Sequence, residues 1–285
     1  MRSRAQARPG ILSILRTAAV VTGVAWAFLR RSAAIHLSYR AKLSLGLASL
    51  VLSVLTFVFV GRAVAAAGPG FVERFGIDYT SFAIVGVLVH AVAASGLRVF
   101  RTALRREQLQ GTLELLVASA VPLPLIVLLA GAGELAVAAA GGAVFVAVAS
   151  ALAKLHVTVT ATSLAAVALY LAFMSGVGLA SAGFVLVSKE GDPISWLLGA
   201  ASGLLGGVYF PVELLPDPLG RVAAVLPTTR ALALARAGVG APWPASPAAS
   251  ILALASAAAI SLTLGLLVLR WGHRRARRAG SLGEY

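Results

Sequence analysis

Six long runs of apolar residues, almost free of charge, constrain this chain more than any other feature of its sequence. Five of the runs lack Asp, Glu, Lys and Arg, and the sixth holds only Glu134. The runs are 43–60, 80–97, 121–153, 155–188, 194–212 and 247–269. A helix needs about 20 apolar residues to cross a bilayer core, and backbone groups in lipid must be hydrogen-bonded within their own segment. The sequence therefore predicts an all-α integral membrane protein with six transmembrane helices.

The two central runs are longer than one crossing requires. Run 121–153 has 33 residues and run 155–188 has 34, but neither contains a polar turn that would divide it into two spans. We therefore expect one span in each run. The extra length would be absorbed by tilting, by protrusion or by a break near Gly131, Gly133 or the glycine pair at 141–142.

The basic residues predict the orientation of the chain in the membrane. The formal net charge is +14, and with six spans one side of the membrane holds both termini and 18 of the 24 Lys and Arg. Positive residues concentrate on the cytoplasmic side, so both termini are predicted to be cytoplasmic and close to anionic lipid headgroups. These charges flank spans and do not gather on a soluble domain, which argues against nucleic-acid binding. Arg outnumbers Lys by 21 to 3, as in proteins from GC-rich prokaryotic genomes, and we expect a prokaryotic cytoplasmic membrane.

We expect a single transmembrane domain over residues 1–285. It comprises an N-terminal segment (1–42), a six-span core (43–270) and a basic cytoplasmic tail (271–285). The apolar stretch 17–29 predicts a helix that lies in the membrane interface, with Trp26 at headgroup depth. A cleaved signal peptide is the alternative, but two arginines at 30–31 separate this stretch from the small residues of a cleavage site.

A dense polar segment separates the second run from the third. Residues 105–116 read RREQLQGTLELL and carry four charges. Leu109, Leu113 and Leu116 lie on one helical face, and polar residues recur every four positions on another. The pattern predicts a helix over 98–119 that either rests on the membrane surface or docks onto a partner protein. Helix propensity and charge pattern alone do not separate these two alternatives.

This segment resembles the cytoplasmic signature of type-2 ABC transporter permeases, in which Gly-Thr-Leu-Glu precedes the third span. The block GGVYFPVELLP at 206–216 is similar to the Phe-Pro and Leu-Pro that close the fifth span in that family. The block LPTTRAL at 226–232 is similar to the family's Leu-Pro followed by a short amphipathic helix. The resemblance covers nearly the whole chain from about Phe28 onward. One departure is Pro122, which stands two residues later than the Thr-Pro or Ser-Pro of many family members and shifts the expected entry of the third span.

The resemblance implies that the polar segment is a coupling helix, which docks into a groove on a separate ATP-hydrolysing subunit. Such a contact needs an apolar ridge and charges that fix its register. The residues implied are Arg105, Arg106, Glu107, Gly111, Thr112, Leu113, Glu114 and Leu116. The resemblance also implies a second permease copy, identical or paralogous, with the transport path at the interface between the two copies. It further implies export, of a substrate that the sequence leaves open.

No nucleotide-binding or catalytic motif is present in the chain. None of its three lysines belongs to the Gly-Lys-Ser/Thr of a P-loop, so ATP and its Mg²⁺ are expected on the partner ATPase. The four histidines are too scattered for a His-Glu-x-x-His zinc site, and no Gly-x-Ser-Gly nucleophile motif occurs. We therefore expect a transport subunit that binds no cofactor or metal and catalyses no reaction.

The region after the fifth run is rich in proline. Pro211, Pro216 and Pro218 fall within eight residues, a density that a continuous helix does not tolerate. The following stretch, 219–239, is too apolar for an ordinary loop. It predicts either short helices that dip back into the outer leaflet or a helix that lies on the surface. The resemblance implies re-entrant helices that form an external gate, with residues Phe210, Pro211, Glu213, Leu215, Pro216 and Pro227.

His90 and Glu134 are ionisable residues inside predicted spans. Burying such a group in a membrane is costly, so each is a candidate for the lining of a transport path. The structural alternative for Glu134 is that it stays protonated or hydrogen-bonds a neighbouring helix, such as the one that carries His90. An ion-gradient-driven secondary transporter is the alternative function, because such carriers also hold ionisable residues in their spans.

Overall fold

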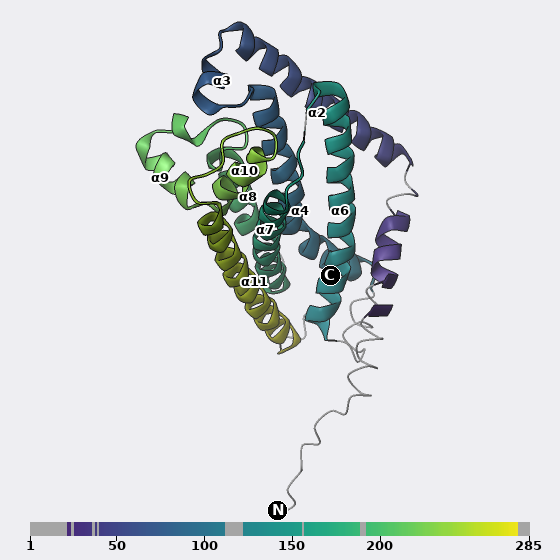
Figure 1. The fold of residues 1–285 in the computed structure, drawn as a ribbon. Coiled ribbons are helices and arrows are strands. Elements are labelled where there is room, and N and C mark those ends of the chain that lie inside the picture. The colour runs from purple at the N-terminus through teal and green to yellow at the C-terminus, as the bar shows by residue number, and fades with distance from the viewer. Residues whose placement is uncertain are drawn as a thin grey trace, which may run out of the picture.

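The structure is a computed structural model that describes residues 22–23, 26–35, 38, 40–111, 122–155, 157–188 and 192–278. Within these residues the regular structure is entirely helical. Long helices lie side by side in one bundle, and short helices gather at its upper end (Figure 1). We call this upper end the hairpin end, defined by α3 (Gly70–Phe75), α9 (Asp217–Val225) and α10 (Pro227–Ala237). The opposite end, where α11 finishes in several arginines, is called the basic end.

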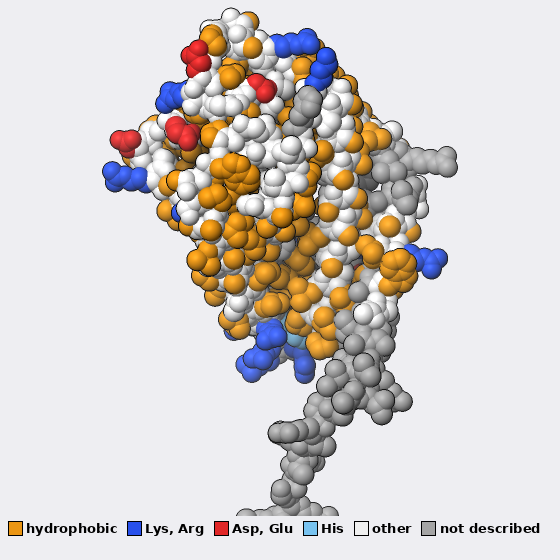
Figure 2. Space-filling model, viewed as in Figure 1, with side chains coloured by type: hydrophobic (Ala, Val, Ile, Leu, Met, Phe, Trp, Pro, Cys, Tyr) orange, Lys and Arg blue, Asp and Glu red, His pale blue; other side chains and the backbone are white. Residues whose placement is uncertain are grey.

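Within the described residues, five helices are long and apolar enough to cross a membrane, as expected of a multi-pass α-helical membrane protein. They are α2 (Arg40–Ala66), α4 (Tyr79–Leu109), α6 (Leu123–Ala153), α7 (Ala161–Ser188) and α11 (Pro247–Arg278). Even α2, with 27 residues, is about 40 Å long at 1.5 Å per residue. Figure 2 shows a band of apolar side chains between a basic lower end and an upper end where acidic side chains gather. The two central runs each form one unbroken helix.

The fifth predicted span, 194–212, is not one continuous helix, so the prediction of six spans is not confirmed. Helix α8 (Pro193–Leu205) has 13 residues, or about 20 Å, and ends where Gly207 adopts a φ of 79°. Only glycine takes up this conformation readily. Segment 195–209 nevertheless runs beside α4, which it contacts near both of its own ends. The Ser195 hydroxyl lies 3.5 Å from the Leu97 carbonyl at one end, and the Tyr79 hydroxyl donates to the Tyr209 carbonyl at the other.

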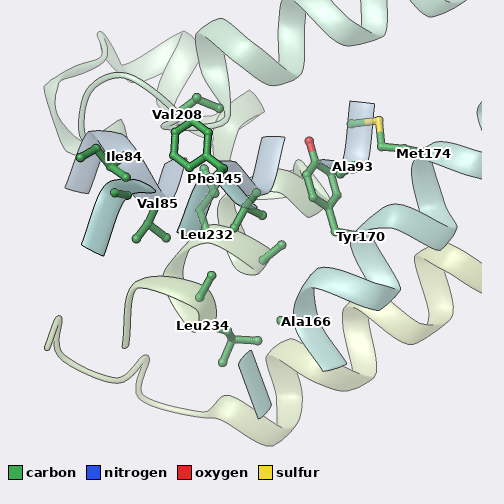
Figure 3. Close-up of a cluster of buried hydrophobic side chains, with 14 of the residues drawn as sticks. Ile84, Val85, Ala93, Phe145, Ala166, Tyr170, Met174, Val208, Leu232 and Leu234 are labelled. Carbon is green, nitrogen blue, oxygen red and sulfur yellow. The ribbon is translucent and has the colours of Figure 1, made fainter. Parts of the chain in front are cut away.

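The buried core surrounds α7. One cluster joins α7 to α4 and α10 through fully buried side chains such as Tyr170, Met174 and Leu232 (Figure 3). Helix α10 is therefore an inserted helix, because seven of its eleven residues are buried. Helix α9 differs, with Ala223 as its buried residue. Helix α9 therefore lies on the outside of the bundle, whereas α10 is packed within it.

The polar segment after the second run departs from its predicted form. We expected a helix over 98–119, but α4 continues without interruption to Leu109 and ends there. Gly111 has a φ of 66°, the left-handed conformation that commonly terminates helices. A Cβ on Gly111 would meet nothing within 4 Å. The role of this glycine is therefore to end helix α4 and not to allow close packing. Thr112, Leu113, Glu114 and Leu116 lie outside the described residues.

Candidate functional site

A cavity of about 1000 Å³ lies between α4, α7 and α8. Helix α4 contributes His90, Ala94, Leu97, Arg98 and Arg101 to its wall, all on one face because these positions are three or four residues apart. The wall is completed by Phe184, Ser188, Asp192, Ser195, Trp196, Gly199 and Ala200. Its lining therefore combines apolar and aromatic surface with two positive charges, one carboxylate and one imidazole. This composition suits transient binding of an amphiphilic molecule.

Asp192 occupies the junction of α7 and α8 at the cavity wall. Its Oδ1 accepts from the backbone N–H of Ser195 at 3.0 Å and so caps α8. Its Oδ2 lies 3.7 Å from Nε of Arg101 and, among the described residues, has no hydrogen-bond donor. Desolvation by burial acts to raise the pKa of this carboxyl, but the neighbouring donors of Ser181 and Ser195 and the charge of Arg101 outweigh it and lower the pKa. Asp192 is therefore an ionised group facing the cavity at neutral pH.

A polar chain connects this cavity to the hairpin end. His90 Nδ1 lies 3.3 Å from the Tyr170 hydroxyl on α7. The Thr228 hydroxyl, in the first turn of α10, donates to the same Tyr170 oxygen at 2.8 Å. Tyr170 and Thr228 are completely buried, so each contact satisfies a group that water does not reach. His90, which the sequence made a candidate for the lining of a transport path, lies on the wall of this cavity.

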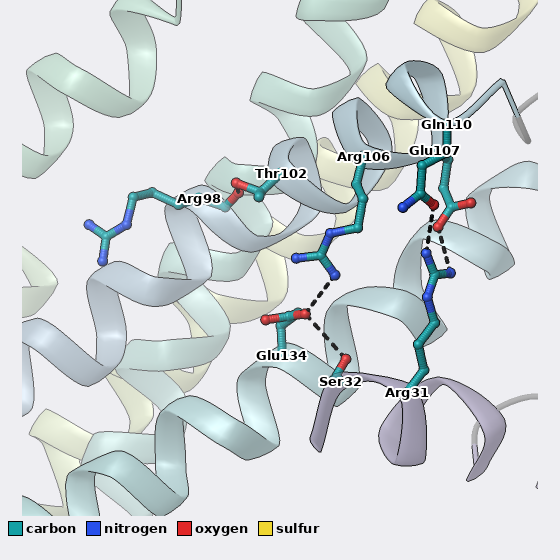
Figure 4. A network of polar contacts seen from close by, with 8 residues as sticks. All are labelled: Arg31, Ser32, Arg98, Thr102, Arg106, Glu107, Gln110 and Glu134. Atoms are coloured by element: carbon teal, nitrogen blue, oxygen red, sulfur yellow. Dashed lines mark hydrogen bonds and ion pairs between the residues drawn. The ribbon is translucent and has the colours of Figure 1, made fainter. Parts of the chain in front are cut away.

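A second polar network lies near the basic end, where α4, α6 and the N-terminal helical segment 26–35 meet (Figure 4). Arg106 donates to the Glu134 carboxylate at 3.0 Å, and the Ser32 hydroxyl donates to the same carboxylate oxygen at 3.2 Å. Arg31 donates to Glu107 at 2.8 Å and to the side chain of Gln110 at 2.9 Å. The end of α4 is therefore held by two other segments at once.

The structure brings together Arg106, Glu107 and Glu134, which the sequence assigned to two different roles. Arg106 and Glu107 make their ion pairs within the chain, although we expected them to fix the docking register of a partner. Glu134 accepts a hydrogen bond from Arg106 on α4, the helix that carries His90. This contact agrees with the structural alternative for Glu134, and Glu134 does not line the cavity. On the same end of α4, Leu109 is 71% exposed. It remains available for an external contact.

The predicted gate residues lie at the hairpin end. Pro216 precedes α9 and Pro227 begins α10, and both residues have a backbone position in which their missing N–H costs nothing. Pro211 and Glu213 line a cavity of about 260 Å³ together with Phe82 and Arg236. Phe210 and Leu215 flank this stretch and are half-buried.

Arg236 on α10 anchors the hairpin end. Its Nε donates to the Phe82 carbonyl at 3.1 Å, its Nη2 donates to the Gly207 carbonyl at 2.7 Å, and its guanidinium lies 3.4 Å from the centroid of the Phe82 ring. Burial lowers the pKa of Arg236 to about 9, and the charge of Glu213 acts in the opposite direction. The guanidinium therefore stays protonated at neutral pH and ties α10 to α4 and to the turn after α8.

Sequence reasoning missed several of these residues. Asp192 was hidden because a lone carboxylate between two apolar runs resembles an ordinary loop residue, although its position before Pro193 is a helix-capping signal. Tyr170 and Thr228 gave no signal, since single hydroxyls are common in membrane helices. Arg31 and Arg236 were counted only as topology charges. A basic residue within the short apolar helix 227–237 was the available signal for a buried Arg.

Comparisons with known proteins add no assignment. No protein-family model matches the chain, and no curated protein matches it significantly. Among the described residues, no group of three His, Asp or Glu side chains is placed to hold a metal ion.

Proposed function

We propose that this chain is the membrane-spanning permease subunit of an ATP-driven exporter. It would form the transport path at an interface with a second copy and couple to a separate ATPase subunit that binds ATP and Mg²⁺. The basic end would face the cytoplasm of a prokaryotic cell and the hairpin end would form the external gate. In this proposal the protein catalyses no reaction of its own.

One observation carries the proposal. Helix α4 is unbroken from Tyr79 to Leu109, and it supplies both the cavity wall and the polar network at the basic end. A helix is stiff along its axis, so a displacement of the network moves His90, Arg98 and the other α4 residues of the wall with it. In this proposal α4 would connect the docking segment mechanically to the cavity that receives the cargo.

The polar chain to the hairpin end supports the same function. Tyr170 contacts both His90 on the cavity wall and Thr228 on α10. A change in the cavity is therefore transmitted to the proposed gate through a shared hydroxyl. Alternating access requires this kind of connection between the two ends of the path.

Affinity purification from native membranes tests the proposal. We expect an ATPase with a Walker-type P-loop to co-elute with the wild-type chain and to be lost with Glu114→Arg. Glu73→Arg is the matched control, since it makes the same charge change on an exposed residue of α3 and should retain the ATPase. An eluate without any ATPase would refute the proposal and favour the ion-gradient-driven carrier. Equal loss in both variants would refute the docking role of the segment.

A further inference from the structure

A second cavity at the hairpin end shares no lining residue with the cavity between α4, α7 and α8. Its volume is about 490 Å³, and it lies where the ends of α2 and α6 meet the beginning of α4. Arg62 and Lys154 line it from α2 and α6, and Asp78, Thr80 and Ser81 line it from α4. Two cations from different helices thus face one cavity that also holds two hydroxyl groups.

The single carboxylate in the lining, Asp78, offsets only one of the two cations, and it forms no ion pair with either of them. Both oxygens of Asp78 serve the start of α4, since Oδ2 accepts from the Ser81 N–H at 2.9 Å and Oδ1 accepts from the Ser81 hydroxyl at 2.7 Å. Within the described part of the chain, neither Arg62 nor Lys154 forms an ion pair with a carboxylate. The cavity therefore retains positive charge that an anion would neutralise.

Lys154 has an unusual backbone conformation. It is the C-cap of α6 with φ 52° and ψ 35°, and among the described residues it is the single non-glycine residue with a positive φ. Glycine or asparagine suits this position better, because a side chain in the left-handed region costs about 1 kcal/mol. Residues held in such conformations occur disproportionately at binding sites. Lys154 therefore places a cation at the cavity at the cost of a strained backbone conformation.

Exposed apolar side chains lie near the cavity on α2 and α6. Phe59, three residues before Arg62, is 61% exposed, and Leu152 is 44% exposed. Leu152 also lines the cavity, and the Arg62 guanidinium lies 5.8 Å from the Phe59 ring centroid. A ligand that fits this surface has an anionic head for the two cations and an apolar body for the exposed side chains between α2 and α6.

We propose that this cavity binds the phosphate group of an anionic phospholipid in the leaflet at the hairpin end. Arg62 and Lys154 contact the phosphate oxygens, the Thr80 and Ser81 hydroxyls lie beside them, and the acyl chains run along α2 and α6 past Phe59 and Leu152. The site is independent of the proposed exporter function, since it requires only a membrane protein with this fold. It would fasten three helix ends together on the side opposite the polar network.

Native mass spectrometry of the detergent-solubilised full chain tests the site, with dioleoyl-phosphatidylglycerol as the probe. We expect the wild type to retain this lipid, and Arg62→Gln and Lys154→Asn each to weaken binding about fivefold, which corresponds to one lost cation near a lipid surface. The double variant should lose about 25-fold. The control double variant, Arg221→Gln with Arg230→Gln, removes two exposed cations of the same end that do not line the cavity and should bind as the wild type does.

A lipid-free melting curve separates binding from folding. Lys154→Gly relieves the left-handed strain, so its melting temperature without added lipid should equal or exceed that of the wild type while lipid retention falls. The proposal is overturned if the cavity and control variants lose lipid equally, or if the cavity variants retain it. It is also overturned if inorganic phosphate displaces the lipid at comparable concentration, because the site would then be one for free anions.

Discussion

The Thr228 hydroxyl donates to the Tyr170 hydroxyl across 2.8 Å, and both side chains are completely buried. This contact joins the first turn of α10 to the middle of α7 at the centre of the core. It also places the same phenol oxygen within 3.3 Å of His90. A single oxygen atom therefore connects the cavity wall, the central helix and the inserted helix of the hairpin end.

Removing that oxygen should destabilise the protein without changing its shape. Tyr170→Phe leaves the Thr228 hydroxyl without its acceptor in a dry environment, which costs about 1–3 kcal/mol. The thermal midpoint in detergent should fall accordingly. Tyr209→Phe is the control, because Tyr209 is 44% exposed and its change should remain within about 0.5 kcal/mol. Equal effects of the two substitutions would show that the buried hydroxyl contributes nothing specific.

The ion pair between Arg106 and Glu134 predicts a measurable coupling between α4 and α6. Glu134→Leu leaves the half-buried Arg106 guanidinium without this carboxylate and should cost about 1–3 kcal/mol, whereas Glu134→Gln keeps an acceptor and should cost less. The double variant Arg106→Leu/Glu134→Leu should recover part of the loss, because no half of the pair is then left behind. The free energies of unfolding of the wild type, Arg106→Leu, Glu134→Leu and the double variant give the coupling energy. If the losses of the two single variants simply add up in the double variant, the predicted coupling is contradicted.

Close packing of α7 on α11 predicts that small residues there cannot be enlarged. A Cβ on Gly183 would lie 2.6 Å from the Cα of Leu269, and backbone atoms cannot move aside as a flexible side chain can. Gly183→Ala should therefore destabilise the protein by about 1–3 kcal/mol through overpacking. In α6, a Cβ on Gly141 would meet nothing within 4 Å, so Gly141→Ala should be neutral or stabilising. Melting temperatures in detergent compare the two variants.

The sequence was sufficient to predict the helices but not the ends of two of them. Backbone polar groups in lipid are satisfied by a helix, and each of the five long helices contains most of one apolar run, although α4 and α11 continue beyond theirs into charged segments. The end of α4 at Leu109 and that of α8 at Leu205 depend on the conformations of Gly111 and Gly207. A glycine tolerates a helix as well as a turn, so the sequence alone did not separate the two outcomes.

Candidate site residues could be predicted only where an ionisable residue interrupted an apolar run. His90 and Glu134 stood out as ionisable residues in apolar runs, and both prove to have polar partners. The identity of those partners depends on which helices are neighbours and how each is rotated, and local periodicity does not carry that information. Arg31 lies 76 residues from Glu107 in the chain, and Arg236 lies 154 residues from Phe82. Such pairings follow from the packed bundle.

The charge state of Asp192 predicts an acid-dependent part of the stability. Its pKa is lowered in the folded chain, so the ionised carboxylate stabilises the fold above the ordinary Asp pKa of about 4. This contribution is lost as the pH falls from there through the lower folded pKa. Asp192→Asn keeps an acceptor for the Ser195 N–H but has no charge to lose. The difference in melting temperature between wild type and variant should therefore shrink below about pH 4, and a constant difference would contradict the assignment.

Arg236 should be irreplaceable even by lysine. Its fork reaches the Phe82 and Gly207 carbonyls from two different nitrogens, and a single ammonium group at the end of a flexible stem does not reproduce that geometry. Arg236→Lys should leave a buried carbonyl unpaired, at a cost of about 1–3 kcal/mol. Backbone amides of 206–212 and of α10 should then exchange hydrogen faster, since these segments are held to α4 through the guanidinium. Arg230→Lys on the exposed face of the same helix is the matched control and should leave exchange unchanged. If Arg236→Lys exchanged at the wild-type rate, the guanidinium would not be what holds the hairpin end to the bundle.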